Sequence, residues 1–192
     1  SGAIRNIGIW YMAGRALTSG DNNIGAGYRA LYSVTSGASN IGLGTDALVN
    51  LDLGNRNVAL GHFAGTGLAN ASDNIAIGYA AASSGLATRA GTVSIGSSAG
   101  LDSTANYGIA IGQDAGLQLV GDGSIAIGYQ ALDATTSGAA GNTAIGCQAG
   151  TAVSTATNNT MLGHQAGQSL TTSSGNTIIG QGALGTSSAT GI

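Results

Sequence analysis

The sequence predicts an all-β protein, a parallel β-roll or solenoid built from about eleven coils of 17 residues. A short motif, seen as Asn-Ile-Ala-Ile-Gly-Tyr-Ala-Ala-Ala at residues 74–82, recurs eleven times at intervals of 16 to 18 residues. A fixed period of this length indicates one structural unit stacked on itself. The chain holds 35 glycines and no proline, which suits a tightly wound coil whose strand amides all join ladders. We expect residues 1–192 to form a single repeat domain and to be a segment of a longer protein.

Each unit is centred on one position, called here the repeat glycine. It is occupied by Gly27, Gly44, Gly61, Gly78, Gly96, Gly112, Gly128, Gly146, Gly163 and Gly180, and Trp10 fills it in the first copy. The residues three and one before it are apolar in most copies, as in Ile75 and Ile77. Alternation at period two with β-branched residues predicts a strand with one buried face, so we expect Ile75 and Ile77 to face inward.

Two further positions complete the coil. Alanine stands three residues after the repeat glycine in all eleven copies, which indicates a place where a larger side chain would collide. Leucine or valine often stands seven residues after it, and this predicts a second, less regular strand. Threonine replaces the first inward residue in the last three coils and is expected to weaken the core there, at Thr143, Thr160 and Thr177.

The residue that opens each predicted strand is asparagine in eight copies: Asn6, Asn23, Asn40, Asn57, Asn74, Asn142, Asn159 and Asn176. Asparagine tolerates left-handed backbone and bonds its own neighbours, so stacked copies are expected to form a ladder at a turn.

The residue two before the repeat glycine forms what we call the central column of the strands. Since it lies between the two positions expected inside, it is expected to point outward. It is mostly small, ending in Met and Ile, where a monomer in water would carry polar side chains. The central column is therefore predicted to be an interface between copies of the chain, with Ala59, Ala76, Ala110, Ala126, Met161 and Ile178 as the contact residues.

The core Asn-x-Ala-Ile-Gly-x-x-Ala, as at residues 74–81 and 142–149, resembles the repeats of trimeric autotransporter adhesin heads. The variants at residues 127–132 and 142–150 resemble repeats of phage tail-fibre proteins and related bacterial surface proteins. The resemblance spans about the whole chain, although the adhesin-head repeats are shorter. It implies a left-handed roll, a side-by-side homotrimer and an extracellular place, either on a virion tail fibre or on a bacterial cell surface. The implied function is a structural fibre or adhesin module that displays a receptor-binding surface for host attachment.

The residue after the repeat glycine is often aromatic or polar. Aromatic faces with polar tips suit sugars, so this column is predicted to bind a cell-surface glycan or a protein receptor. The alternative is that it packs against a neighbouring subunit. The candidates are Tyr11, Tyr28, His62, Tyr79, Tyr129 and His164.

Composition excludes several classes of function. The net charge is −3 and the only strongly basic residues are five arginines, which argues against nucleic acid. Cys147 is the single cysteine, so no internal disulfide forms, and no apolar run approaches the roughly 20 residues that span a membrane. The G-x-S-x-G at residues 96–100 is the repeat consensus with serines in its free positions. We expect no catalytic residue, no metal ligand and no cofactor.

Two other functions fit the pattern less well. Residues 77–82 satisfy the hexapeptide rule of left-handed β-helix acyltransferases, which are trimeric enzymes, but those need three consecutive hexapeptides per turn and only one per coil qualifies here. An ice-binding solenoid would need a flat threonine array. The chain offers a column of three, which the predicted phase turns inward.

Overall fold

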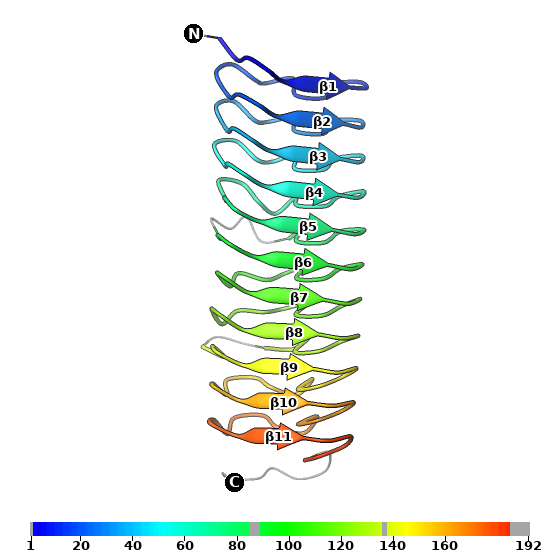
Figure 1. Cartoon of the computed structure of the whole chain (residues 1–192), viewed down its shortest axis with the longest axis vertical. Coiled ribbons are helices and arrows are strands. Elements are labelled where there is room, and N and C mark those ends of the chain that lie inside the picture. Colours follow the sequence, from blue (N-terminus) through cyan, green and yellow to red (C-terminus); the bar gives the residue numbers. More distant parts are fainter. Residues whose placement is uncertain (1, 85–88, 136–137, 185–192) are drawn as a thin grey trace.

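The fold is a single stack of coils, each contributing one short strand to one long parallel sheet. The computed structural model describes residues 2–84, 89–135 and 138–184. Consecutive strands pair in parallel, in chain order, as Figure 1 shows. The strands are β1 (Ile7–Ile9), β2 (Ile24–Ala26), β3 (Ile41–Leu43), β4 (Val58–Leu60), β5 (Ile75–Ile77), β6 (Val93–Ile95), β7 (Ile109–Ile111), β8 (Ile125–Ile127), β9 (Thr143–Ile145), β10 (Thr160–Leu162) and β11 (Thr177–Ile179).

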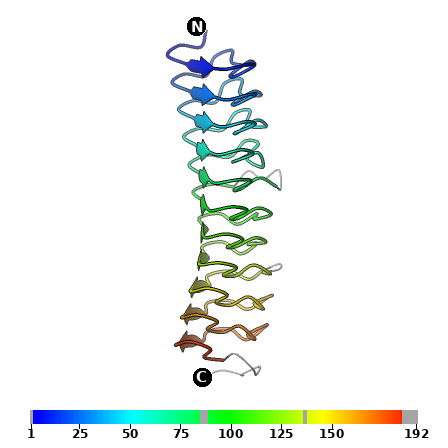
Figure 2. The same ribbon diagram turned by 90° about the vertical axis from the view of Figure 1, so that its right-hand side faces the viewer.

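The strands line one side of the stack and the connecting turns form the other side (Figure 2). Equivalent residues of neighbouring coils pair in register, for example Ala59 with Ala76 and Leu60 with Ile77. The all-β solenoid with a spacing of about 17 residues, predicted from the repeat, is confirmed. The left-handedness of the coil stays a prediction, and so does the expectation that the chain forms a single domain.

The predicted second strand is absent from the described coils, and a bonded turn takes its place. The residues two and four after the repeat glycine have positive φ, as at Arg29 (53°) and Leu31 (55°). This alternation prevents extended backbone. The coils still bond to one another there, since the Leu31 amide donates to the Ala47 carbonyl (3.0 Å) and the Ser33 amide donates to the Val49 carbonyl (3.2 Å).

The strands face the opposite way from the prediction. The side chain of Ala76 is fully buried, whereas its neighbour Ile75 is 37% exposed and Ile77 is half-buried. In β2 to β11 the middle residue is always the buried one, and the residues on either side of it never are. The central column therefore points into the coil, and the two flanking columns point outward.

The reason for this reversal is the width of the coil. Large side chains of the turn segment already fill the interior opposite the strand, so the strand must present a small one. A Cβ added at Gly25 would lie 3.4 Å from Cδ1 of Leu31. In the coil of Met161 the turn carries glycine and the strand residue is large: a Cβ at Gly167 would lie 2.7 Å from Sδ of Met161. In these two coils the strand and the turn are complementary in size.

The prediction that the invariant alanine stands in a crowded place is confirmed. The alanine three residues after the repeat glycine is fully buried in nine consecutive coils, from Ala30 to Ala166. The leucine and valine side chains four residues further on are buried at Val34, Leu51, Leu68, Leu119, Val153 and Leu170.

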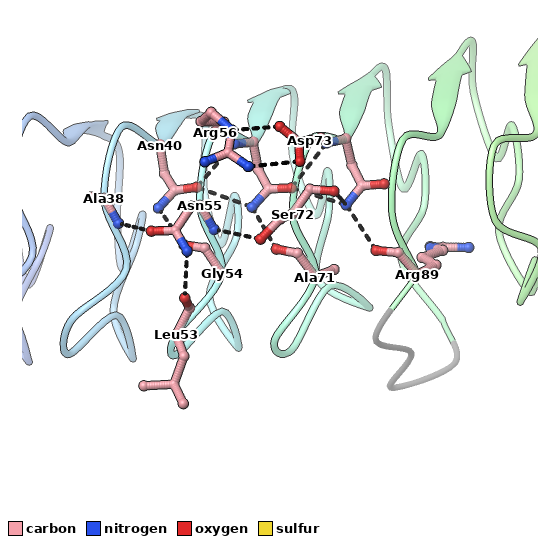
Figure 3. Close-up of polar contacts among 12 residues, drawn as sticks. Ala38, Asn40, Leu53, Gly54, Asn55, Arg56, Ala71, Ser72, Asp73 and Arg89 are labelled. Carbon is pink, nitrogen blue, oxygen red and sulfur yellow. Dashed lines mark hydrogen bonds and ion pairs between the residues drawn. The ribbon is translucent and has the colours of Figure 1, made fainter.

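The asparagine ladder is also confirmed, and Figure 3 shows part of it around Asn40. Asn57 donates both its backbone N–H and its Nδ2–H to Oδ1 of Asn40, each at 3.0 Å. The Nδ2 of Asn57 also donates to the carbonyl of Ala71 (2.8 Å). From Asn23 onward the asparagines of the ladder are buried, so their amide groups satisfy backbone that water cannot reach. The run breaks in the middle of the stack, where Thr92, Gly108 and Ser124 replace asparagine.

The repeat glycines stack so closely that no side chain fits between them. A Cβ added at Gly78 would lie 2.4 Å from the carbonyl oxygen of Gly96, and the φ of Gly78 is 131°. The last of the column, Gly180, has nothing within 4 Å of such a Cβ.

The apolar core falls into two parts. One buried cluster runs from Leu31 to Ala82 and the other from Ala99 to Ile178. Polar side chains are buried between or beside them, at Arg89, Thr92, Ser94 and Ser103. Burial lowers the pKa of Arg89 to about 10, so its guanidinium stays charged at neutral pH.

Candidate binding surfaces

The outer face of the sheet is an apolar surface that runs along the whole stack. We define it as the two flanking columns, which hold no charged residue and only three polar ones. The first column is Ile7, Ile24, Ile41, Val58, Ile75, Val93, Ile109, Ile125, Thr143, Thr160 and Thr177. The second is Ile9, Ala26, Leu43, Leu60, Ile77, Ile95, Ile111, Ile127, Ile145, Leu162 and Ile179. Exposed members reach from one end of the stack to the other, including Ile9 (57%) and Ile179 (65%).

The predicted interface residues do not lie on this face. Their side chains are buried inside the coil, so the prediction that they contact another copy is wrong for Ala59, Ala76, Ala110, Ala126, Met161 and Ile178. Met161 and Ile178 fill room that turn glycines leave, as described above. An apolar stripe does face outward, as expected, but it consists of the two flanking columns rather than the central column.

The prediction that the three threonines of the last coils point inward is also wrong. Thr160 and Thr177 are exposed and Thr143 is half-buried, all on the outer face. They do not weaken the core, because they replace outward isoleucines. They do make the outer face more polar over its last three coils.

A second surface lies at the turn edge, which we define as the first two residues after each repeat glycine. In Figure 1 these turns follow the arrowheads of the strands. The rings of Tyr11 and Tyr28 lie parallel within 14°, with centroids 5.8 Å apart. The guanidinium of Arg29 lies over the Tyr28 ring, 5.3 Å from its centroid, and its Nε–H donates to Oδ1 of Asp46 (2.7 Å).

A second aromatic group lies two coils further along the same edge. The ring centroids of His62 and Phe63 are 3.8 Å apart, and Tyr79 meets both rings edge-on at 5.8 and 6.2 Å. Phe63 was missed by sequence reasoning because it stands two residues after the glycine, in a column of mixed residue types. Its φ of 61° turns its side chain toward the same edge. The structure therefore brings together four of the six predicted receptor residues in two groups.

The other two candidates, Tyr129 and His164, have no aromatic neighbour among the described residues. Glutamine dominates the turn edge in their part of the stack. Gln148 donates its amide to Oε1 of Gln130 (3.2 Å), and Gln165 donates to Oε1 of Gln148 (3.0 Å). The turn edge thus changes from aromatic in the first five coils to amide-rich in the later ones.

The ion pairs of the described chain join neighbouring coils. Arg56 donates to both carboxylate oxygens of Asp73, at 2.6 and 2.8 Å, as Figure 3 shows. These hydrogen bonds hold the pKa of Asp73 below its usual value. Both side chains are exposed, so the pair adds little stability.

Residues 2–84, 89–135 and 138–184 contain no group of three or more His, Cys, Asp or Glu side chains that could hold a metal ion. Over the same residues, none of the hydrogen bonds links the Ser98 side chain to a histidine or aspartate. Cys147 is a free, half-buried thiol. The described part of the chain also has no helix of the length and apolar character that crossing a bilayer requires.

Comparison of the chain with protein-family models, with curated proteins and with solved structures gives no match.

Proposed function

We propose that the chain is a structural module of a fibre or adhesin, a homotrimeric shaft or head that displays a receptor-binding surface. It would act outside the cell, on a virion tail fibre or on a bacterial surface. The observation that carries the proposal is the apolar outer face, which a monomer would leave in water.

The size of this face favours association. Ten strand spacings of about 4.8 Å make it about 48 Å long, and three strand residues make it about 10 Å wide. That footprint of several hundred Å² is contiguous and uncharged, and continuous apolar patches of such size usually mark an interface. Nothing within the described chain covers it, so another chain is the simplest occupant.

A second copy of the same chain fits this face well. Copies related by an axis parallel to the stack would bring identical coils to the same height, so the isoleucine columns of one copy would meet the isoleucine columns of its neighbours level by level. Such copies also run in the same direction, as a fibre requires. The number three comes from the resemblance to adhesin heads and tail fibres.

The mechanism that follows is mechanical extension combined with multivalent display. A stack held by in-register ladders is a stiff spacer, and three copies of one weak site on a trimer bind a surface with greater avidity than one. The turn edge leaves the outer face free for assembly, because its residues follow the strands rather than belonging to them.

Cysteine cross-linking tests the assembly. In a Cys147→Ala background, Ile111→Cys should form disulfides between chains under mild oxidation, because the outer faces packed around the axis would hold all copies of this residue at one height and close to one another. The readout is a covalent dimer band on a denaturing gel without reductant.

Tyr107→Cys in the same background is the matched control. Tyr107 is exposed but stands in the turn before β7, outside the two flanking columns, and it should stay uncross-linked. Equal cross-linking of both variants would show random collision and would count against the proposed interface.

A further inference from the structure

We infer that the aromatic part of the turn edge is a binding site for a linear, uncharged polysaccharide that runs along the stack. The site consists of Tyr11, Tyr28, His62, Phe63 and Tyr79, with Arg29 beside them. This inference rests on the proposed function, since it names the ligand class of the receptor-binding surface.

The first argument is that the tyrosine hydroxyl groups of this site make no hydrogen bond with the described residues. Among the hydrogen bonds of the described residues, none uses the hydroxyl of Tyr11, Tyr28 or Tyr79, although Tyr32 accepts one from Arg15 (3.1 Å). Tyr11 is 60% and Tyr79 56% exposed. These side chains therefore offer both ring surface and unused hydroxyl groups to an outside partner.

The second argument is chemical. A sugar ring has an apolar C–H face and a rim of hydroxyls, and an aromatic side chain with a polar tip matches both. Arg29 gives its Nε–H to Asp46, and no hydrogen bond among the described residues uses its Nη groups, which are suited to sugar hydroxyls. The Arg29 charge is compensated by Asp46, so the edge does not select an anionic polymer.

The third argument is periodicity. The rings recur with the coils, and Tyr11 and Tyr28 are nearly parallel at 5.8 Å, a distance comparable with the length of one pyranose unit. A surface that repeats along one axis suits a ligand that repeats along the same axis. A chain of several sugars would span both aromatic groups, while the Thr45 coil between them carries no ring.

The rings are also held in place. Arg29 packs on Tyr28, and Tyr79 contacts both His62 and Phe63. Side chains ordered before binding lose less entropy when a ligand arrives, which favours a flexible partner such as a polysaccharide.

The test is affinity electrophoresis in native gels that contain hydroxyethyl cellulose, glycol chitin, dextran or hyaluronan. We expect at least one of the uncharged polymers to retard the wild-type protein. Titration calorimetry with matching oligosaccharides should then show tighter binding of a hexasaccharide than of a disaccharide. The double change Tyr28→Ala and Tyr79→Ala should weaken binding about tenfold or more, because it removes one ring from each of the two aromatic groups on which the sugars would stack.

Tyr107→Ala is the control, since it removes an exposed tyrosine that does not belong to the turn edge, and it should bind like the wild type. Light scattering on each variant separates the two ideas. A trimer that binds no polymer, or a double variant that binds as well as the wild type, overturns the glycan site and leaves the assembly standing. Retardation by hyaluronan alone, abolished by salt, also overturns it, because charge rather than stacking would then be responsible.

Discussion

The two faces of the sheet obey different rules, and Ala76 and Ile77 of β5 illustrate them. Ala76 is fully buried and faces the turn segment of its own chain, while Ile77 is half-buried and faces away from it. On the inner face the strand residue fits the turn residue opposite, as Gly25 does against Leu31 and Met161 against Gly167. On the outer face most residues are large and apolar, except Ala26 and the three threonines of the last coils, although the described chain leaves many of them exposed. The fold accounts for the inner face, and the proposed contact with other copies of the chain would account for the outer one.

The sharpest test of this comparison changes neighbouring residues to the same charge. Ala76→Asp should unfold the surrounding coils, because an unpaired carboxylate inside the coil costs several kcal/mol. Ile77→Asp should leave the coil folded but weaken association. Circular dichroism during heating measures the first effect and light scattering the second. If both variants lost structure to the same extent, the distinction between a buried inner face and an exposed outer face would be wrong.

The glycine column gives the next largest effect. Gly78→Ala should cost about 3 kcal/mol or more, since its new Cβ would meet the Gly96 backbone at a φ that L-residues avoid. Gly180→Ala, at the open end of the column, should cost only the backbone strain. Thermal unfolding of the two variants compares them. Equal losses would contradict the close stacking of the coils.

The sequence alone could predict the period, all eleven strand positions, the asparagine ladder and the buried alanines, because each depends on residues at fixed spacing. The sequence does not show as directly which side chains of each strand point into the coil. A three-residue strand such as Ile-Ala-Ile alternates equally well in both orientations, and counting apolar residues favours the wrong one. The missing signal was the turn residue four after the repeat glycine, which is Leu in the coil of Gly25 and Gly in the coil of Met161.

The candidate binding surface was predictable in part. Tyr11, Tyr28, His62 and Tyr79 stand in one column of the repeat, so their common edge follows from the period. Phe63 belongs to the next column, and its approach to His62 depends on a positive φ that the sequence does not reveal.

The asparagine ladder provides a smaller test of the inner face. Asn57→Ala should destabilise the protein by about 1 to 3 kcal/mol, because Asn40, Ala71 and Asn74 each lose a bonding partner in a buried place. Asn176→Ala is the control at the end of the ladder, where Oδ1 of Asn176 has no partner among the described residues. Chemical denaturation should show the smaller loss for Asn176→Ala. A larger loss there would mean that the ladder does not act as a chain of bonds.

Arg89 is the exception on the inner side, and it gives the smallest expected change. Its Nη1 donates to the Ser103 carbonyl, but Nε and Nη2 have no partner among the described residues. Equivalent positions hold Gly54 and Ala71, as the ladder bonds from Asn40 and Asn57 show. Arg89→Leu keeps apolar bulk and removes the buried charge, so it should stabilise the protein by about 1 kcal/mol. Arg56→Leu, at the exposed ion pair, should change the melting temperature little. A lower melting temperature for Arg89→Leu would show that the buried Arg89 guanidinium stabilises the folded protein.

The mass of the protein in solution tests the central claim most directly. Size-exclusion chromatography with light scattering at micromolar concentration should give three times the chain mass of 18.4 kDa for the wild type. It should give the single-chain mass, with unchanged β-structure by circular dichroism, for a variant carrying Ile77→Asp and Ile111→Asp on the outer face. A wild-type protein that is a stable, soluble monomer would contradict the account, since its isoleucine columns would then be exposed to water without a partner.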